Sequence, residues 1–364
     1  MRIVAKIGTS SITDANGAIA VSMVESLCAQ VADLRGAGHE VLVVTSGAVA
    51  GGVAALGMTA RPSDTATLQA LAAAGQSRLM SHYNAALDKH RLVGAQVLLV
   101  PNDFIDRAQY LHARQTMLRL LELGCVPIIN ENDAIASDEI RFGDNDRIAA
   151  LVAHSVNADL LVLLTDRAGL FTADPSVDAN ATLIEHVAAD DELMSVRAGS
   201  TSGTVGSGGM ASKLSAARIA SWSGVRTVIA AAKRGDVLRD AVSGVSGVGT
   251  TFTAHDRSLT ARKLWIAFAA QPAGSVTVDA GAQNALVSRG VSLLHAGVVQ
   301  VQGDFGPGDV VDVLGESGDL VARGLVRADA RAAGAAAGKK SSELPDDVPT
   351  ELVHRDDLIV YSVS

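Results

Sequence analysis

Aromatic side chains are scarce in this 364-residue chain: Phe, Trp and Tyr make up 3% of it, against 48% for all hydrophobic residues. The core must therefore consist mostly of Ala, Val, Leu and Ile, and it is large enough for one large domain or two domains. Positive charge is also in deficit, because 30 Lys and Arg face 39 Asp and Glu, for a net charge of −9. This balance argues against nonspecific binding to nucleic acids or anionic membranes.

Features of membrane, secreted and metal-binding proteins are missing from the sequence. No apolar run approaches the ~20 residues of a membrane span. The first residues, MRIVAKIGTSS, do not resemble a signal peptide, because the apolar run is short and Lys6 interrupts it. The two cysteines, Cys28 and Cys125, fit no metal-binding or CxxC spacing. We therefore expect two buried thiols in a cytoplasmic protein with no membrane partner.

Several common catalytic motifs are absent as well. The chain contains neither a GxxxxGK[ST] phosphate loop nor a GxSxG hydrolase motif. The histidines are scattered and indicate no metal cluster. The run HRDD, from His354 to Asp357, matches a protein-kinase tripeptide, but no VAIK accompanies it, and it lies in the last part of the chain, where short alternating runs predict strands. We therefore attribute this match to chance.

The first two thirds of the chain alternate apolar strands with helical patterns. Val24, Leu27, Val31 and Leu34, for example, recur at helical spacing after the first strand. The predicted strands cover residues 2–8, 39–47, 92–100, 125–130, 159–166 and 225–231. Strands that are apolar throughout and alternate with helices indicate an α/β fold whose mostly parallel sheet is covered on both faces. Ligands bind beyond the carboxyl ends of the strands in such sheets.

The pattern changes after about Phe252, where short alternating runs punctuated by Gly and Pro begin. We predict a first domain over residues 1–253, a linker over 254–261 and a small β-rich or barrel-like domain over 262–360. Within the latter, the low-complexity stretch from Ala328 to Gly338 indicates a weak helix or a mobile insert.

The stretch from Asn130 to Asp146, NENDAIASDEIRFGDND, holds six acidic side chains and three Asn side chains within 17 residues. Placing so many carboxylates and amides between two buried elements is costly without ligands or partners. A functional loop at the end of a strand would explain them. A solvated acidic loop is the alternative, since charged runs are usually exposed.

Four further features lie at strand ends or helix starts, and each has a structural alternative. Lys6 lies inside a buried strand, so it must reach an anion or extend to water. Ser46 and Gly47 begin a turn that suits an anion, or simply close strand-to-helix packing. Thr165 and Asp166 end a strand, where they either contact a ligand or cap a turn. The glycine-rich run 202–213 ends at Lys213 in the expected first turn of a helix from Ala211, and serves as a phosphate cradle or a flexible loop.

Two lysines, two glycine-rich elements and an acidic, Asn-rich loop together suit phosphoryl transfer, which depends on positioning and cationic stabilisation. At this point the sequence resembles the amino acid kinase family, through KIGTS, VTSGAVA, VPIINENDA, GDND, LLTDRAGLFTADP and GGMASK in that order. The resemblance covers Arg2 to about Phe252. The segment from Arg262 to Val360 resembles a PUA domain in its place and length.

The resemblance implies a three-layer α/β/α kinase domain that phosphorylates the γ-carboxylate of L-glutamate with ATP and Mg2+, the first step of proline biosynthesis. By position, Lys6 and Lys213 neutralise the transferring phosphoryl group and Asp146 orients both lysines. The residues implied for glutamate are Ser46, Asn130, Asp133 and Asn145. The residues implied for ATP are Lys6, Thr165, Asp166, Ser207, Gly208, Gly209, Met210, Ala211, Ser212 and Lys213. Ser207 and Ser212 replace a more usual Thr but keep the hydroxyl.

The resemblance also implies feedback inhibition by proline and a homo-oligomer, either a dimer or a tetramer. It leaves the metal ligands unidentified, and we interpret residues 134–142 as a mobile flap. Acetylglutamate kinases and aspartokinases of the same family are alternatives, although aspartokinases normally carry tandem regulatory domains. RNA binding through the PUA-like domain is another alternative. Charge argues against it, because residues 253–364 carry 10 Lys and Arg and 14 Asp and Glu.

Overall fold

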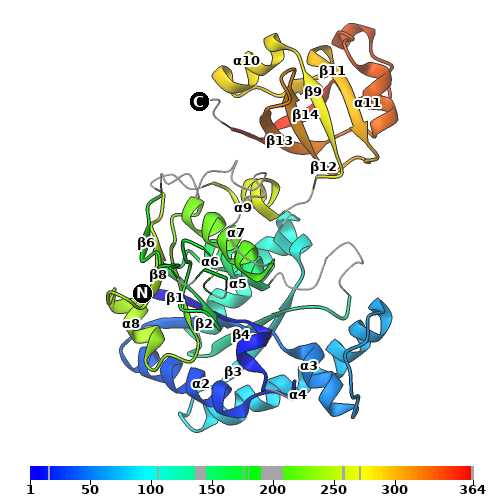
Figure 1. Cartoon of the computed structure of the whole chain (residues 1–364). Coiled ribbons are helices and arrows are strands. Elements are labelled where there is room, and N and C mark those ends of the chain that lie inside the picture. The colour runs from blue at the N-terminus through cyan, green and yellow to red at the C-terminus, as the bar shows by residue number, and fades with distance from the viewer. Residues whose placement is uncertain are drawn as a thin grey trace. The chain divides into compact units, whose positions relative to one another are not determined.

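The computed structural model describes residues 1–14, 17–104, 106–135, 145–173, 175, 177–178, 180–189, 208–255, 259–269 and 272–361. They form two compact units, one with the described residues up to 255 and one with those from 259 onward. Each unit has a hydrophobic core of its own. Figure 1 labels most of the elements of both. Among the described residues, no helix is both long and apolar enough to cross a membrane.

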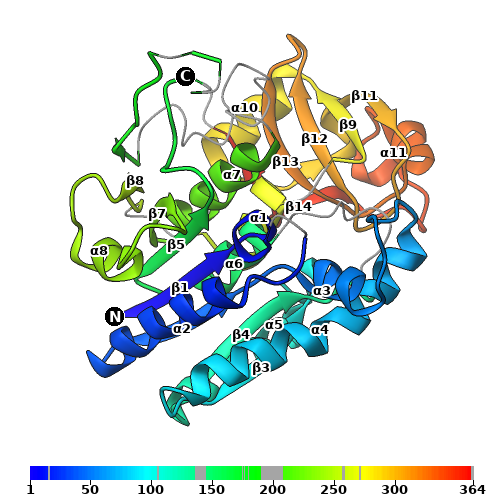
Figure 2. The ribbon, with the colours of Figure 1, turned by 60° about the horizontal axis from the view of Figure 1, so that its bottom comes forward.

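The first unit contains an eight-stranded sheet with the order β3-β4-β2-β1-β5-β7-β8-β6. All its neighbouring strands pair in parallel except β7 and β8. Figure 2 shows β1, β3, β4 and β5 running in one direction. The strands are β1 (Arg2–Ile7), β2 (Glu40–Val44), β3 (Gly94–Leu99), β4 (Val126–Glu131), β5 (Leu160–Thr165), β6 (His186–Val187), β7 (Arg226–Ala231) and β8 (Gly249–Phe252). The six predicted strands are confirmed, whereas the two short ones, β6 and β8, were not predicted.

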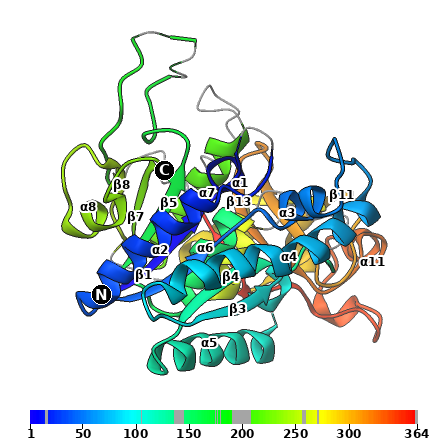
Figure 3. The same cartoon turned by 90° about the horizontal axis from the view of Figure 1, so that it is seen from below.

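Helices cover both faces of this sheet. The first unit holds α1 (Thr9–Ile12), α2 (Val21–Gly36), α3 (Ala48–Ala55), α4 (Thr65–Asp88), the 3-10 turn η1 (Pro101–Phe104), α5 (Arg107–Glu122), α6 (Asn145–Ser155), α7 (Gly208–Trp222) and α8 (Val237–Ser243). Helices α2, α4 and α8 share one core with the sheet, and α5, α6 and α7 pack on the other face. Figure 3, seen from below, shows α2 and α4 in front of the strands. The three-layer α/β/α prediction is therefore confirmed.

Alternation along β1 decides which face receives its lysine. Ile3, Ala5 and Ile7 belong to the core shared with α2 and α4. Successive side chains of a strand point to opposite faces, so Lys6 lies on the face covered by α6. This register explains how a lysine can occupy a strand that is otherwise apolar.

Helices α3 and α4 approach each other at glycines. A Cβ added to Gly75 would lie 1.8 Å from the carbonyl oxygen of Ala48, and one added to Gly52 would lie 2.0 Å from that of Leu71. Gly47, which precedes α3, has φ of +104°, a conformation that favours glycine. The small residues that the sequence places after Ser46 therefore serve close helix packing as well as the turn.

The second unit is built on a six-stranded sheet with the order β10-β14-β13-β12-β9-β11. Its elements are α9 (Ala261–Leu264), the π-helical turn η4 (Trp265–Ala269), β9 (Gly274–Val278), α10 (Ala280–Arg289), β10 (Leu293–Leu294), η5 (His295–Gly297), β11 (Val298–Gly303), β12 (Val310–Gly315), β13 (Leu320–Val326), α11 (Ala330–Ala336), η6 (Ser341–Glu343) and β14 (Glu351–Val360). The predicted β-rich domain is confirmed. The Ala-rich stretch forms helix α11, which begins at an Asp329 cap that accepts a hydrogen bond from the Ala332 N–H.

Two details of the sequence prediction are tested by the fold, and a third lies mostly outside the described residues. Asp357 of the HRDD run forms a 2.6 Å ion pair with Arg262, so this aspartate ties α9 to β14, in agreement with our rejection of a kinase motif. Cys28 is buried as predicted, but Cys125 is half-buried, because it lies in the turn before β4. The interpreted flap falls mostly outside the described residues, which stop at Ile135 and resume at Asn145.

Candidate active site

The carboxyl ends of four parallel strands bring the predicted residues to one edge of the first unit's sheet. Lys6 pairs in register with Val44 of β2 and with Leu163 of β5, so the ends of β1, β2 and β5 are level. Strand β4 lies beside β2 and ends at Glu131. Polar groups at this edge are placed where parallel α/β sheets bind their ligands.

Two lysines from distant elements converge on one carboxylate. The Nζ of Lys6 lies 2.6 Å from Oδ1 of Asp146 in α6, and the Nζ of Lys213 in α7 lies 3.3 Å from Oδ2. The hydroxyl of Ser212 also donates to Oδ2, at 2.7 Å. The side chains of Lys6 and Asp146 are 5% and 2% exposed. The cluster is therefore almost dry, which strengthens its electrostatic interactions.

This cluster carries one net positive charge. Burial alone would raise the pKa of the Asp146 carboxyl, but the charges of Lys6 and Lys213 outweigh it and hold that pKa below its ordinary value. Asp146 is therefore ionised at neutral pH, and it neutralises one of the two ammonium charges. The remaining charge suits an anion such as a transferring phosphoryl group.

Helix α7 begins earlier than the sequence predicts. It starts at Gly208, so GGMASK forms its first turns and Lys213 is its sixth residue instead of lying in the first turn. The Nζ of Lys213 also donates to the carbonyl of Gly209 at 3.2 Å, which holds the side chain back along the helix toward its N-terminus. Ser207 lies outside the described residues.

Ser46 and Asn145 are joined directly. The Asn145 Nδ2 donates to the Ser46 hydroxyl at 3.1 Å, and the Asn145 Oδ1 accepts from the backbone N–H of Glu131 at 3.2 Å. One amide therefore links the ends of β2 and β4 to the first residue of α6. All three residues are buried, so this part of the site is fixed by the protein.

Asn130 lies deeper than its predicted role requires. Its Nδ2 donates to the Oε1 of Gln76 at 2.9 Å, its Oδ1 accepts from the Glu131 N–H at 3.0 Å, and the residue is 1% exposed. Both the nitrogen and the oxygen of its amide thus have partners within the protein. Sequence reasoning missed Gln76, although a glutamine among apolar residues at helical spacing was a visible signal.

Asp133 follows β4 in a half-buried turn. Burial raises the pKa of its carboxyl from 3.8 to about 6, although the charge of Arg61 acts in the opposite direction. A carboxylate whose ionised form is poorly solvated gains from a cationic partner. Asp133 is therefore suited to an ammonium group.

Thr165 and Asp166 form a separate polar pair at the end of β5. The Thr165 hydroxyl donates to Oδ1 of Asp166 at 2.9 Å. Thr165 is buried and Asp166 is exposed. The pair is thus open to a ligand on its Asp166 side.

The described residues offer no protein cage for a metal ion. Among them, no group of three His, Cys, Asp or Glu side chains is placed to hold one, and the Asp146 carboxylate is occupied by the lysines and Ser212. Mg2+ normally uses one or two carboxylates together with substrate phosphates and water. The residues fit an ion that arrives with a nucleotide better than a resident one.

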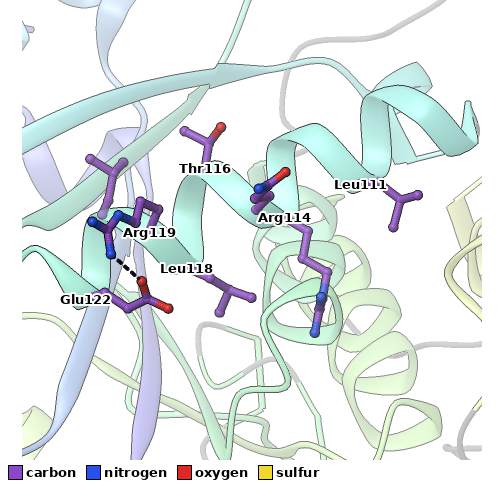
Figure 4. Close-up of a pocket in the computed structure, with 8 residues that line it drawn as sticks. Leu111, Arg114, Thr116, Leu118, Arg119 and Glu122 are labelled. Carbon is purple, nitrogen blue, oxygen red and sulfur yellow. Dashed lines mark hydrogen bonds and ion pairs between the residues drawn. The ribbon is translucent and has the colours of Figure 1, made fainter.

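A surface pocket of about 850 Å3 lies elsewhere, along α5. Figure 4 shows its side chains projecting from this one helix, with Arg119 and Glu122 paired at 2.8 Å. It is lined by Leu111, Arg114, Gln115, Thr116, Leu118, Arg119, Leu120 and Glu122. None of these residues is among those predicted for the site.

Comparison with known proteins assigns both units. A model of the amino acid kinase family matches residues 1–231, and a model of the PUA domain matches residues 274–347. The chain belongs to the amino acid kinase family. It is 47% identical to the glutamate 5-kinase of Thermobifida fusca (strain YX), over 99% of this chain and 93% of that protein. It is 46% identical to the glutamate 5-kinase of Rhodococcus jostii (strain RHA1), over 98% and 96% of the two chains.

A further relative extends the same likeness. The chain is 44% identical to the glutamate 5-kinase of Nitrosomonas eutropha (strain DSM 101675 / C91 / Nm57), over 99% of this chain and 97% of that protein. The similarity therefore runs through the kinase unit and the PUA domain alike. An amino acid kinase followed by a PUA domain, which the sequence predicted, is confirmed.

Proposed function

We propose that this protein is an ATP-dependent kinase that converts L-glutamate to L-glutamyl 5-phosphate, the first step of proline biosynthesis. The observation that carries the proposal is Asp146, which binds Lys6 and Lys213 beside the Ser46–Asn145 pair. A cationic centre suited to phosphoryl transfer thus adjoins a pair of polar side chains. The names of the relatives point to the same reaction.

The reaction needs no general base at this site. The γ-carboxylate of glutamate is ionised at pH 7 and is already a nucleophile. One of its oxygens bonds to the γ-phosphorus of ATP while the bond from that phosphorus to the β,γ-bridging oxygen breaks, and ADP leaves with the electron pair. Lys6 and Lys213 stabilise the negative charge spread over the phosphoryl oxygens. Asp146 keeps the two ammonium groups from separating by mutual repulsion.

Glutamate would be held at the ends of β2 and β4. We assign its ammonium group to Asp133, whose poorly solvated carboxylate gains from a cationic partner. Ser46 and Asn145 offer a hydroxyl and an amide at the same edge. We assign Asn130 a supporting position below these groups, because it is 1% exposed and its amide contacts Gln76 and the Glu131 N–H.

ATP would occupy the side of the site formed by β5 and α7. Thr165 and Asp166 end the strand, and the backbone from Gly208 to Lys213 forms the start of a 15-residue helix, whose N-terminal end favours phosphate. Ser207 would contribute from just before this helix. Mg2+ would accompany the nucleotide phosphates and neutralise part of their charge.

A coupled ADP-release assay with L-glutamate, N-acetylglutamate and L-aspartate tests the substrate. We expect turnover with glutamate and little with the other two. Turnover only with N-acetylglutamate or aspartate would contradict the proposal and favour another member of the family. Omitting Mg2+ in the presence of a chelator should abolish activity.

Regulation and assembly follow from the same proposal. We assign feedback inhibition to proline, a cytoplasmic location, and a homo-oligomer, either a dimer or a tetramer. Helix α5 supports self-association, because two of its 16 residues, Met117 and Leu121, are buried while Leu111 is 47% exposed. Light scattering would give the mass, and a Leu111→Glu substitution should lower it if α5 contributes.

The PUA domain does not lead us to propose RNA as the main partner. Its acidic balance opposes phosphate-backbone contacts. Gel-shift experiments with structured RNA at micromolar protein should show no salt-dependent complex. A complex that weakens steeply with salt would revive the RNA-binding alternative.

A further inference from the structure

Helix α4 carries two polar side chains on a face that is otherwise apolar. Its buried residues recur at helical spacing, and among them Gln76 is 8% exposed and Tyr83 is fully buried. Burying an amide or a hydroxyl costs free energy unless it is hydrogen-bonded. Both side chains therefore need partners, and both find them toward the ends of the strands that form the candidate site.

Gln76 uses both ends of its amide. Its Oε1 accepts from the Nδ2 of Asn130 at 2.9 Å, and its Nε2 donates to the Oε1 of Gln96 in β3 at 3.0 Å. Asn130 and Gln96 lie on the adjacent strands β4 and β3, which are paired in parallel. Gln76 thus fixes the Asn130 amide in one orientation, with the oxygen turned toward the Glu131 N–H.

That orientation matters for the end of β4. The Glu131 N–H is shared between the side-chain oxygens of Asn130, at 3.0 Å, and Asn145, at 3.2 Å. The backbone continues from Glu131 to Asp133 within two residues. The position of Asp133 and the orientation of Asn145 therefore both depend on an N–H that Gln76 holds indirectly.

Tyr83 forms a second connection from the same helix face, seven residues along. Its hydroxyl donates to the Thr45 hydroxyl at 2.9 Å, and Thr45 in turn donates to the carbonyl of Ser46 at 3.0 Å. Tyr83 therefore reaches the end of β2 as Gln76 reaches the end of β4. A single rigid helix sets the spacing between the two strand ends.

We infer that Gln76 is a positioning residue of the amino acid subsite, acting through Asn130 and the Glu131 N–H on Asn145 and Asp133. The inference rests on the proposed function, because it takes glutamate as the ligand of that subsite. It assigns no contact between Gln76 and substrate. Loss of its amide should impair glutamate binding while leaving the β5 and α7 side, assigned to ATP, unchanged.

The test is steady-state kinetics of the full-length protein with Gln76→Leu. We expect the KM for glutamate to rise about tenfold or more, since each 1.4 kcal/mol is a factor of ten and one buried Asn amide loses its partner. The KM for ATP should stay within twofold. A purely structural role would lower the melting temperature without separating the two KM values.

Gln96→Leu is the matched control, because it removes the other partner of Gln76 but leaves the bond to Asn130. It should leave both KM values within about twofold. Gln76→Met, which fills similar volume, is a second variant in case Gln76→Leu does not fold. Melting curves with and without glutamate show whether each folded variant still binds glutamate.

An unchanged KM for glutamate in folded Gln76→Leu or Gln76→Met would overturn the inference while the proposed function stands. Equal losses for glutamate and ATP would also overturn it, because they indicate general disturbance. If the wild-type protein fails to phosphorylate glutamate in the same assay, the proposed function fails and the inference falls with it.

Discussion

The Nζ of Lys6 lies 2.6 Å from the Oδ1 of Asp146, although the two residues are separated by more than a third of the chain. The parallel sheet makes this contact possible, because β1 ends beside the start of the helix that follows β4. Lys213 approaches the other oxygen of the same carboxylate. Two ammonium groups and one carboxylate are thus buried as a unit, and removing the carboxylate leaves two buried positive charges without a counter-charge.

Asp146→Asn should be costly for both stability and turnover. It leaves two buried lysines facing a neutral amide, and removal of one partner from a buried ion pair typically costs about 3–5 kcal/mol. We expect the free energy of unfolding, measured by urea denaturation, to fall by an amount of that order. We also expect kcat to fall by about 100-fold or more. Glu25→Gln is the control: Glu25 pairs with Lys89 at the same 2.6 Å, but their side chains are 44% and 60% exposed, so the loss should stay below about 1 kcal/mol.

Lys213→Met should slow turnover by orders of magnitude, since it removes a charge directed at the transferring phosphoryl group. The KM for glutamate should change little, because the β2 and β4 strand ends do not depend on Lys213. Steady-state kinetics in both substrates would measure the split. Lys89→Met, at an exposed position on the C-terminal side of α4, should leave kcat unchanged; an equal kcat for wild type and Lys213→Met would refute the assigned role.

Asp133 gives the site a dependence on pH. Because the pKa of its carboxyl is raised to about 6, the ionised form that attracts an ammonium is lost as the pH falls below 6. The KM for glutamate should therefore rise between pH 7 and pH 5. In Asp133→Asn it should be high at every pH in this range and nearly flat, and a KM profile that kept the wild-type shape would exclude Asp133 as the titrating group.

The same raised pKa predicts how the stability of the folded protein depends on pH. Ionisation of Asp133 favours binding of an ammonium group, but it opposes folding. A carboxyl whose pKa is higher in the folded state than its ordinary value of 3.8 favours folding at low pH, and this contribution is lost as the pH rises through about 6. At pH 8 Asp133 therefore opposes folding. Asp133→Asn should raise the melting temperature relative to wild type at pH 8 more than at pH 5, which calorimetry at the two pH values would show.

Much of the fold was predictable because the strands are buried on both faces. Continuous apolar runs such as that of β5 mark such strands clearly. The short β8, with the sequence GTTF, has no such run and pairs antiparallel to β7, so only its pairing with β7 and β6 in the fold identifies it. The early start of α7 was missed because Gly208 and Gly209 have low helix propensity, which the surrounding structure overrides.

Site residues could be predicted where the residue type itself indicates a role. They could be predicted less well where the role depends on contacts with distant residues. A lysine in a buried strand indicates a partner, and Asp146 supplies it. The supporting position of Asn130 could not be derived from the motif, because its partner Gln76 comes from a helix 54 residues earlier in the chain. Hydrogen bonds between elements so far apart follow from the packing of α4 on the sheet, which the pattern alone does not specify.

The two units should fold separately. Their cores contain no common residue, and the contacts of α9 and η4 belong to the second unit: Arg262 pairs with Asp357, and Arg323 donates to the carbonyl of Ala267 at 3.4 Å. A chain ending at Ser258 should therefore be folded and retain kinase activity. Circular dichroism and the coupled assay would test this, and complete loss of activity in a folded truncated chain would contradict it.

Gly75→Ala should disturb the candidate active site, although Gly75 is not one of the residues assigned to it. The new Cβ would lie 1.8 Å from the carbonyl oxygen of Ala48, a backbone atom that cannot yield without moving α3. We expect a loss of about 3 kcal/mol or more, at the upper end of overpacking costs, and a fall in kcat/KM for glutamate because α3 begins just after Ser46 and Gly47. Gly334→Ala is the matched control: Gly334 is exposed within α11 and has no atom within 4 Å of an added Cβ. It should stabilise its unit by about 0.5–1 kcal/mol. Similar melting temperatures for the two variants would show that the contact between α3 and α4 at Gly75 does not exclude a larger side chain.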